Sequence, residues 1–297
     1  MCRKDDLRLF WILTVLMLLS INTAAQTRPP SSLTIKTSPR TIIWVDSLRY
    51  GAVGESGELT VKNLREGTHT VRARLKGKRE VTQTITLAAE SQQSIQINFS
   101  SPADKAELSF QIAEELRERG KHADAIKEYR NAIRLRPQGY PAARIGLARS
   151  LMAGDKYDEA IAEARRAMRE KQGPYPEAYV VIANTKRTQA LYDDAISNYR
   201  TALSLARNFS PEAHTGLAIT YQDRNRAEDA IKQFQAAVAQ SNDTEPILYF
   251  LLGSALEREY RNKEAVEAYE KYLQLDPNGS QASAIRSVVR QLKREIR

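Results

Sequence analysis

Residues 122–135, HADAIKEYRNAIRL, decide how the second part of the chain folds, because their pattern returns four times. The later copies are 157–170 (YDEAIAEARRAMRE), 192–205 (YDDAISNYRTALSL), 227–240 (AEDAIKQFQAAVAQ) and 262–275 (NKEAVEAYEKYLQL). Each copy has an alanine at its fourth place, and these alanines, Ala125, Ala160, Ala195, Ala230 and Ala265, are 35 residues apart. A fixed period of this length is typical of stacked supersecondary units, none of which buries its apolar face alone.

Three further sets of positions keep the same period. Small residues stand twelve places before each of these alanines and seven places after most of them, and a Tyr, Phe or Ala stands four places after. The sets are Ala113, Ala148, Ala183, Ala218 and Gly253; Ala132, Ala167, Ala202, Ala237 and Tyr272; and Tyr129, Ala164, Tyr199, Phe234 and Tyr269. Small residues on one face let two helix backbones approach closely, and the larger side chain fills the remaining gap. We therefore expect five helical hairpins.

The repeats resemble the tetratricopeptide repeat. In that family helix A has a small residue at position eight, helix B has alanines at positions twenty and twenty-seven, and proline is frequent at position thirty-two. Pro137 and Pro277 occupy that last place, whereas Gln172, Arg207 and Asn242 depart from it. The unit is also one residue longer than the usual length of about 34. The repeats begin near residues 106, 141, 176, 211 and 246 and cover 106–280, and the resemblance implies an all-α superhelical solenoid.

The first 25 residues have the pattern of a signal peptide. Basic residues precede an apolar run from Leu9 to Ile21, which is shorter than the about 20 residues of a membrane-spanning helix. Small residues at Thr23 and Ala25 predict cleavage near Ala25, and we expect an extracytoplasmic protein, periplasmic or secreted. The alternative is an uncleaved N-terminal membrane anchor, with the rest of the chain facing the periplasm. Cys2, the one cysteine, lies in this segment, so no disulfide is expected in the mature chain.

Residues 26–31 are predicted to be a linker, after which residues 32–100 show the alternating pattern of short strands. Strands are expected at 33–37, 42–46, 68–75, 81–87 and 94–99, with turns near Pro39, Gly67 and Gly77. Strands of this length and spacing predict a small antiparallel β-sandwich. A second linker, 101–105, joins it to the hairpins. The predicted fold class is therefore α+β multidomain, with a β-sandwich followed by an all-α solenoid.

The β-segment is similar to the PEGA family of small extracytoplasmic β-domains. The similarity rests on the motifs 43–46 (IWVD), 50–52 (YGA) and 63–69 (NLREGTH). The segment departs from the family at Ser47, where glycine is frequent, and in the Pro-Glu-Gly-Ala motif itself. Because that family is associated with the bacterial surface and envelope and has no known catalysis, the resemblance implies a binding or spacer module.

Residues 281–297 are predicted to form a C-terminal capping helix, because the last repeat of a solenoid otherwise exposes its apolar side. Ile285, Val289 and Leu292 lie on its apolar stripe, and the other face is basic. The whole chain has 45 Lys and Arg against 36 Asp and Glu. This excess is scattered and lacks interleaved aromatic residues, so nucleic acid is not an expected partner. An anionic membrane surface, met through the basic β-domain or the last helix, is a second expected partner.

No catalytic, cofactor-binding or metal-binding motif is found, and we do not expect an enzyme. The histidines, His69, His122 and His214, are isolated, and neither a phosphate-binding loop nor a nucleophile elbow is present. An enzymatic alternative requires chemistry around Trp44, Asp46 and His69.

In the tetratricopeptide family helix A lines the inner surface, and its positions five, nine and twelve identify candidate residues of a peptide-binding groove. The candidates are Phe110, Glu114, Arg149, Asn184, Arg187, Ile219, Gln222 and Phe250. Apolar side chains flanked by Arg and amide groups suit a peptide with hydrophobic anchors and some acidic residues. The alternative is that the apolar residues pack within the array and the groove is unused. Alanine at Asn184 and Arg187 is expected to weaken binding without lowering the melting temperature.

We therefore expect a non-enzymatic scaffold that mediates protein–protein interaction in the bacterial cell envelope, with a protein or peptide in its concave groove. The alternative is a structural or self-assembling envelope protein that is anchored to the cell wall or membrane surface through its β-domain. The oligomeric state is left open.

Overall fold

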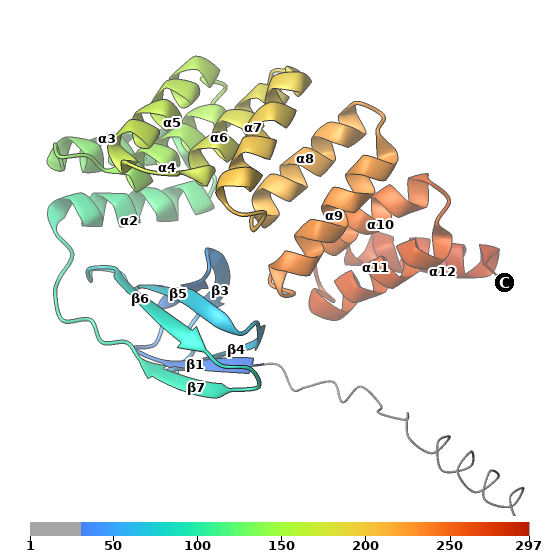
Figure 1. The fold of residues 1–297 in the computed structure, drawn as a ribbon, viewed down its shortest axis with the longest axis horizontal. Coiled ribbons are helices and arrows are strands. Elements are labelled where there is room, and N and C mark those ends of the chain that lie inside the picture. Colours follow the sequence, from blue (N-terminus) through green and yellow to red (C-terminus); the bar gives the residue numbers. More distant parts are fainter. Residues whose placement is uncertain (1–30, 297) are drawn as a thin grey trace, which may run out of the picture.

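The computed structural model describes residues 31–296, in which a β-domain of seven strands precedes a row of eleven helices (Figure 1). The predicted α+β class, a small sandwich followed by a helical solenoid, is confirmed. The predicted signal peptide lies outside the described residues. Within residues 31–296, no helix is both long enough and apolar enough to cross a bilayer.

The β-domain consists of two facing sheets with a common apolar core. Its strands are β1 (Ser31–Lys36), β2 (Ile42–Val45), β3 (Leu48–Ala52), β4 (Glu58–Leu64), β5 (Gly67–Arg74), β6 (Val81–Leu87) and β7 (Gln92–Gln96). The sheet orders are β4-β1-β7 and β3-β2-β5-β6. Strands β1 and β7 pair in parallel, and the other pairs are antiparallel. Alternate residues such as Leu33, Ile35 and Val71 are fully buried between the sheets, as the alternating pattern predicts.

A two-residue turn joins β2 to β3. Val45 pairs with Leu48, so Asp46 and Ser47 form the turn, with φ of 50° and 71°. Positive φ at both positions is typical of a type I′ turn, whose twist matches that of the two strands. Ser47 thus has the left-handed backbone that glycine adopts most easily. The Asp46 carboxylate fixes the turn, because it accepts from the Thr70 N–H at 2.9 Å and from His69 Nδ1 at 2.5 Å.

The helices form five antiparallel hairpins and one final helix. They are α2 (Lys105–Glu118) with α3 (His122–Leu135), α4 (Pro141–Ala153) with α5 (Tyr157–Lys171), α6 (Pro176–Thr188) with α7 (Tyr192–Leu205), α8 (Pro211–Asp223) with α9 (Ala227–Ser241), α10 (Ile247–Arg258) with α11 (Asn262–Leu275), and α12 (Ala282–Glu295). All five alanines of the 35-residue series are fully buried. This confirms that they mark the contact within each hairpin.

Neighbouring hairpins fit together through matched large and small residues. The buried Tyr129 ring of α3 lies over Gly146 of α4, where an added Cβ would come within 2.4 Å of the ring. Tyr199 of α7 and Gly216 of α8 repeat this relationship, again at 2.4 Å. These contacts explain why the ring and the glycine occur together: a side chain at the glycine would displace a fully packed tyrosine.

The turn inside each hairpin also follows the 35-residue period. Its left-handed residue is Gly120, Asp155, Ala190, Asn225 or Tyr260, with φ between 54° and 71°. After the last hairpin, α12 buries Ile285, Val289 and Leu292. Its basic residues remain exposed, and membrane-surface binding by this face stays a prediction.

The helical array arches over the β-domain (Figure 1). At one end of the arch, the Glu80 N–H donates to Glu107 Oε1 of α2 at 2.6 Å. Beside it, the Gln111 side chain accepts from the Gly77 N–H and donates to the Lys78 carbonyl, both at 2.9 Å. These bonds attach the segment between β5 and β6 to the first hairpin.

The β-domain also contacts the fourth hairpin. The Asn242 side chain, at the C-terminal end of α9, donates to the Tyr50 hydroxyl at 2.9 Å and to the Lys62 carbonyl at 2.7 Å. The β-domain therefore bridges the first and fourth hairpins across the inner side of the arch.

Candidate binding site between the β-domain and the helical array

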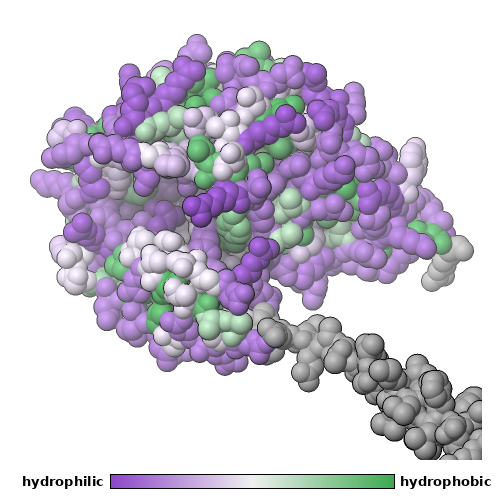
Figure 2. All heavy atoms as spheres, in the orientation of Figure 1, coloured by the Kyte–Doolittle hydropathy of each residue, from purple (hydrophilic) through white to green (hydrophobic). Residues whose placement is uncertain are grey.

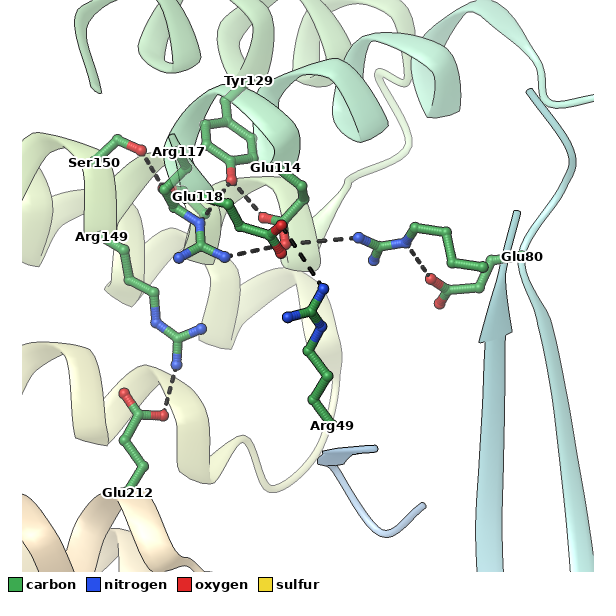
Figure 3. A network of polar contacts seen from close by, with 11 residues as sticks. Arg49, Glu80, Glu114, Arg117, Glu118, Tyr129, Arg149, Ser150 and Glu212 are labelled. Carbon is green, nitrogen blue, oxygen red and sulfur yellow. Dashed lines mark hydrogen bonds and ion pairs between the residues drawn. The ribbon is translucent and has the colours of Figure 1, made fainter. Parts of the chain in front are cut away.

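Arg74 of β5 organises the contact with the first hairpin. Its Nε donates to Glu80 at 2.8 Å, and its Nη1 lies 3.6 Å from the Glu114 carboxylate of α2. The guanidinium also lies over two aromatic rings, Phe110 at 4.9 Å and Trp44 at 5.0 Å. Figure 3 shows Glu80 and Glu114 converging on this contact. The Arg74 side chain is only 10% exposed and contacts both domains. Solvent therefore has little access to this end of the interface.

Further along the arch, the two domains line an open chamber of about 850 Å³. The surface is hollowed where the β-domain faces the helices (Figure 2). Leu48, Arg49 and Arg72 line the chamber from the β-domain. The opposite wall comes from inner helices α6, α8 and α10 and includes Val180, Asn184, Arg187, Ile219 and Ile247. A volume of this size is within the range of ligand-binding pockets, roughly 300–1,000 Å³.

Several charged groups of the chamber already have partners. Arg72 lies 4.4 Å above the Trp44 ring and 3.9 Å from Glu80. Burial lowers the pKa of Arg72, although the Glu80 carboxylate favours its charged form. Glu212 of α8 accepts from Arg149 of α4 at 2.7 Å, a bond that crosses the inner surface between the second and fourth hairpins (Figure 3).

Other charged groups of the chamber have longer-range contacts only. The buried Nε of Arg187 has no hydrogen-bond partner in the described part of the chain, and the closest carboxylate, Asp223, is 4.0 Å from Nη1. Glu177 and Glu245 also line the chamber, and Glu177 favours the charged form of Arg72. Burial raises the pKa of Glu245, and Arg49 is the cation that opposes this rise. Of these groups only the Arg187 Nε is both buried and unpaired, which is rare in folded proteins.

The candidate groove residues fall into four places. Asn184, Arg187 and Ile219 meet in the chamber, and Arg149 adjoins it through Glu212. Phe110 and Glu114 lie under the β-domain at Arg74. The remaining two lie elsewhere: Gln222 lines a smaller hollow of about 160 Å³, and Phe250 packs against Tyr269 and Tyr272, with ring centroids 6.3 Å apart in both pairs.

Two of these candidates also bind tyrosines of helix B. Tyr129 donates its hydroxyl hydrogen bond to Glu114, and Tyr199 donates one to Asn184 Oδ1 at 2.5 Å. Burial raises the pKa of Tyr199 to about 12, so its hydroxyl keeps its proton and remains a donor at neutral pH. The repeat pattern places both tyrosines in the core but does not reveal this bond to the inner surface.

Sequence reasoning missed the β-domain side of the site. Leu48 and Arg49 were not candidates, because no pattern in the sequence shows that the two domains face one another. The one available signal was the short linker at 101–105, which limits their separation. Phe209 and Ile247, large apolar residues left 39% and 44% exposed, were also missed.

Asp46 and His69 are close together, but their contact holds the β2–β3 turn in place. His69 is 7% exposed, and its two ring nitrogens lie 2.5 Å from the Asp46 carboxylate and 2.8 Å from the Arg65 carbonyl. The ring thus has no free nitrogen to act as a base on a substrate. In residues 31–296, no group of three or more His, Cys, Asp or Glu side chains is arranged to hold a metal ion.

The fold and the inner surface define an α-solenoid with an N-terminal β-domain. Family profiles described as tetratricopeptide repeat match residues 116–183, 181–245 and 215–280. The chain therefore carries tetratricopeptide repeats from 116 to 280 and belongs to the tetratricopeptide-repeat proteins, whose fold is that of a protein–protein interaction scaffold. No curated protein matches the chain.

Two solved structures share the solenoid fold. One is a thermophilic tetratricopeptide-repeat protein of Thermus thermophilus, which is 17% identical, with a TM-score of 0.53; the match covers 63% of this chain and 98% of that one. The other is the Cut9–Hcn1 hetero-tetramer of the APC/C, which is 20% identical, with a TM-score of 0.53; the match covers 62% of this chain and 36% of the matched chain.

Proposed function

We propose that this protein is an exported, non-enzymatic scaffold of the bacterial envelope that holds a segment of another protein on the inner side of its arch. The observation that carries this proposal is the convergence of Asn184, Arg187 and Ile219 on an open chamber. An apolar surface with a few convergent polar groups is typical of a binding site. The envelope location is supported by the signal-peptide pattern of residues 1–25 and by the PEGA resemblance of the β-domain.

The binding proposal is tested by cross-linking the full chain to its partners in the envelope fraction of the producing cells. Arg187→Gln is the preferred variant, because it removes the cation while the Tyr199 bond to Asn184 remains. Arg134→Gln, on the exposed face of α3, is the matched control. Capture lost with Arg187→Gln and kept with Arg134→Gln supports the proposal, and equal capture by both variants and the unmodified chain contradicts it.

The location is tested separately by N-terminal sequencing of the protein from cell fractions. A chain recovered outside the cytoplasm that begins near Gln26 supports export with cleavage after Ala25. An intact N-terminus in the cytoplasmic fraction contradicts export.

A further inference from the structure

We propose that the chamber binds an extended peptide whose apolar residues lie between a basic residue at one end and an acidic residue at the other, and that the β2–β3 turn forms one wall of this site. The proposal rests on the proposed function and narrows it from an open groove to a composite site made by both domains.

The apolar walls indicate the middle of the ligand. Phe209 and Ile247 keep much of their surface exposed, and both line the chamber with Val180 and Ile219. Leu48 belongs to the facing wall of the β-domain. Large exposed apolar residues that gather in a hollow with polar groups at its edges mark an interaction site rather than ordinary surface.

The side chains of Asn184 and Arg187 mark the place where the acidic residue of the ligand would bind. They are three residues apart on α6 and therefore lie on the same face of the helix. Asn184 Oδ1 accepts from Tyr199, which leaves its amide hydrogens as donors, and the Arg187 side chain is 30% exposed, with Asp223 4.0 Å from its Nη1. Two adjacent donors, one of them cationic, match a carboxylate of the ligand.

The side chains of Glu177 and Glu245 mark the place where the basic residue of the ligand would bind. Glu177 is the second residue of α6, and Glu245 lies just before α10. Both line the chamber, and Glu245 is exposed while Glu177 is half-buried. Their carboxylates are therefore accessible to a Lys or Arg side chain of the ligand, beside Arg72 and Arg49, the cations of the chamber that already interact with them. Glu212, at the corresponding place on α8, is already bound to Arg149 and is not available.

The geometry of α6 sets the spacing between the two ends. Glu177 and Arg187 are ten residues apart, which corresponds to about 15 Å along a helix. An extended peptide advances about 3.3 Å per residue. The basic and acidic residues of the ligand are therefore expected roughly four to five positions apart, with apolar residues between them.

The β2–β3 turn is rigid enough to serve as a wall. Asp46 holds it through the Thr70 N–H and the buried His69 ring, and Leu48 and Arg49 follow directly in β3. Asn242 attaches the same hairpin to the fourth repeat through Tyr50. The wall is therefore fixed in relation to both the sheet and the array, which lowers the ordering cost of binding.

The test is selection of random heptapeptides displayed on phage against the immobilised full chain. The selected peptides are then synthesised, and their affinities are measured for the full chain and four variants. Ile247→Arg fills the array side of the chamber, and Leu191→Arg is its control, because Leu191 has nearly the same exposure, 43% against 44%, and does not line the chamber. Leu48→Arg alters the β-domain wall, and Thr82→Arg on the exposed face of β6 is its control.

The expected peptides have a basic and an acidic residue four to five positions apart with apolar residues between. Ile247→Arg and Leu48→Arg each weaken their binding by at least about tenfold, the scale of one lost central contact. Both controls bind as the unmodified chain does. Circular dichroism and the melting temperature check that the variants are folded.

The other outcomes overturn the proposal in distinguishable ways. Loss with Ile247→Arg but not with Leu48→Arg shows that the array binds peptides without the β-domain wall, so the composite site is wrong and the proposed function stands. Peptides that lack the charge pattern, or that bind both chamber variants unchanged, also refute the composite site alone. No selected peptide at all refutes the chamber as a peptide site, whereas the proposed function is decided by the cross-linking experiment.

Discussion

The Tyr199 hydroxyl of α7 donates a hydrogen bond to Asn184 Oδ1 of α6 at 2.5 Å, and the Tyr199 side chain is otherwise fully buried. Asn184 therefore has two roles: it stabilises the third hairpin and presents its amide to the chamber. Glu114 and Tyr129 have the same relationship two hairpins earlier, in the first hairpin. A substitution at such a residue is therefore expected to change the stability of the protein as well as its binding.

The first prediction concerns Asn184→Ala. This substitution leaves the buried Tyr199 hydroxyl without its acceptor, so the free energy of unfolding should fall by about 1–3 kcal/mol. This prediction replaces the expectation, based on sequence alone, that alanine at Asn184 leaves the melting temperature unchanged. Urea unfolding measures the change, with Tyr199→Phe as the background control. In that background Asn184→Ala should cost much less, and equal costs in both backgrounds would show that the bond is not coupled to stability.

A second prediction follows from the fit of Tyr199 on Gly216. In Gly216→Ala the new Cβ would lie 2.4 Å from the ring, so the tyrosine must move within a packed core. We expect a net loss of stability of about 1–2 kcal/mol, because overpacking outweighs the helix propensity gained from alanine. Gly154→Ala is the control, since an added Cβ there meets atoms no closer than 3.6 Å. Equal unfolding midpoints for the two variants would contradict the packing.

The third prediction concerns pH and Glu114. Burial would raise the pKa of this carboxyl, but Arg117, the Tyr129 hydroxyl and Arg74 together lower it below its ordinary value of 4.5. A lowered folded-state pKa contributes stability that is present above the unfolded-state pKa and is lost as the pH falls through the folded-state pKa.

This contribution is measured as the difference in unfolding free energy between the unmodified chain and Glu114→Gln. The difference should be constant from pH 7 to about pH 5 and should shrink below about pH 4.5. Other carboxyl groups titrate in both proteins and largely cancel. A difference that stays the same down to pH 3 would show that the charge of Glu114 does not stabilise the fold.

The fourth prediction concerns the contact between Gln111 and the β-domain. Gln111→Ala removes the acceptor of the Gly77 N–H and the donor to the Lys78 carbonyl. Hydrogen exchange of the Gly77 amide should therefore accelerate, because the amide is protected by this one side chain. Gln96→Ala, which alters an exposed bond inside the β-domain, should leave the rate unchanged. Unchanged exchange in Gln111→Ala would mean that the domains do not dock through this residue.

The helical array was predictable from sequence because its signal is local and repeated five times. A residue such as Ala195 meets the same neighbours in every hairpin, so spacing alone identifies its burial. The β-domain was harder. Strands β3 and β4 were not predicted, because Tyr50-Gly51 and Lys62-Asn63 interrupt the alternating pattern. Their backbones bend there, with positive φ at Gly51 and Asn63.

Only the helical wall of the candidate site could be predicted from the sequence. The inner positions of α6 and α8 follow from the repeat, and this gave Asn184, Arg187 and Ile219. The other wall depends on contacts between residues far apart in the sequence, such as Asn242 with Tyr50. No periodicity encodes such a pairing, and its polar partners look like ordinary surface residues until the domains are placed together.

The most direct test of the central claim, that the β-domain spans the arch from the first to the fourth hairpin, is a cross-link between positions 62 and 242. Lys62→Cys and Asn242→Cys are combined in a Cys2→Ser chain and treated with a short bis-maleimide. Because the Asn242 side chain lies 2.7 Å from the Lys62 carbonyl, a rapid cross-link within one chain is expected. Single-cysteine chains control for links between molecules. Full labelling of both cysteines without a link between them would contradict the closed arch.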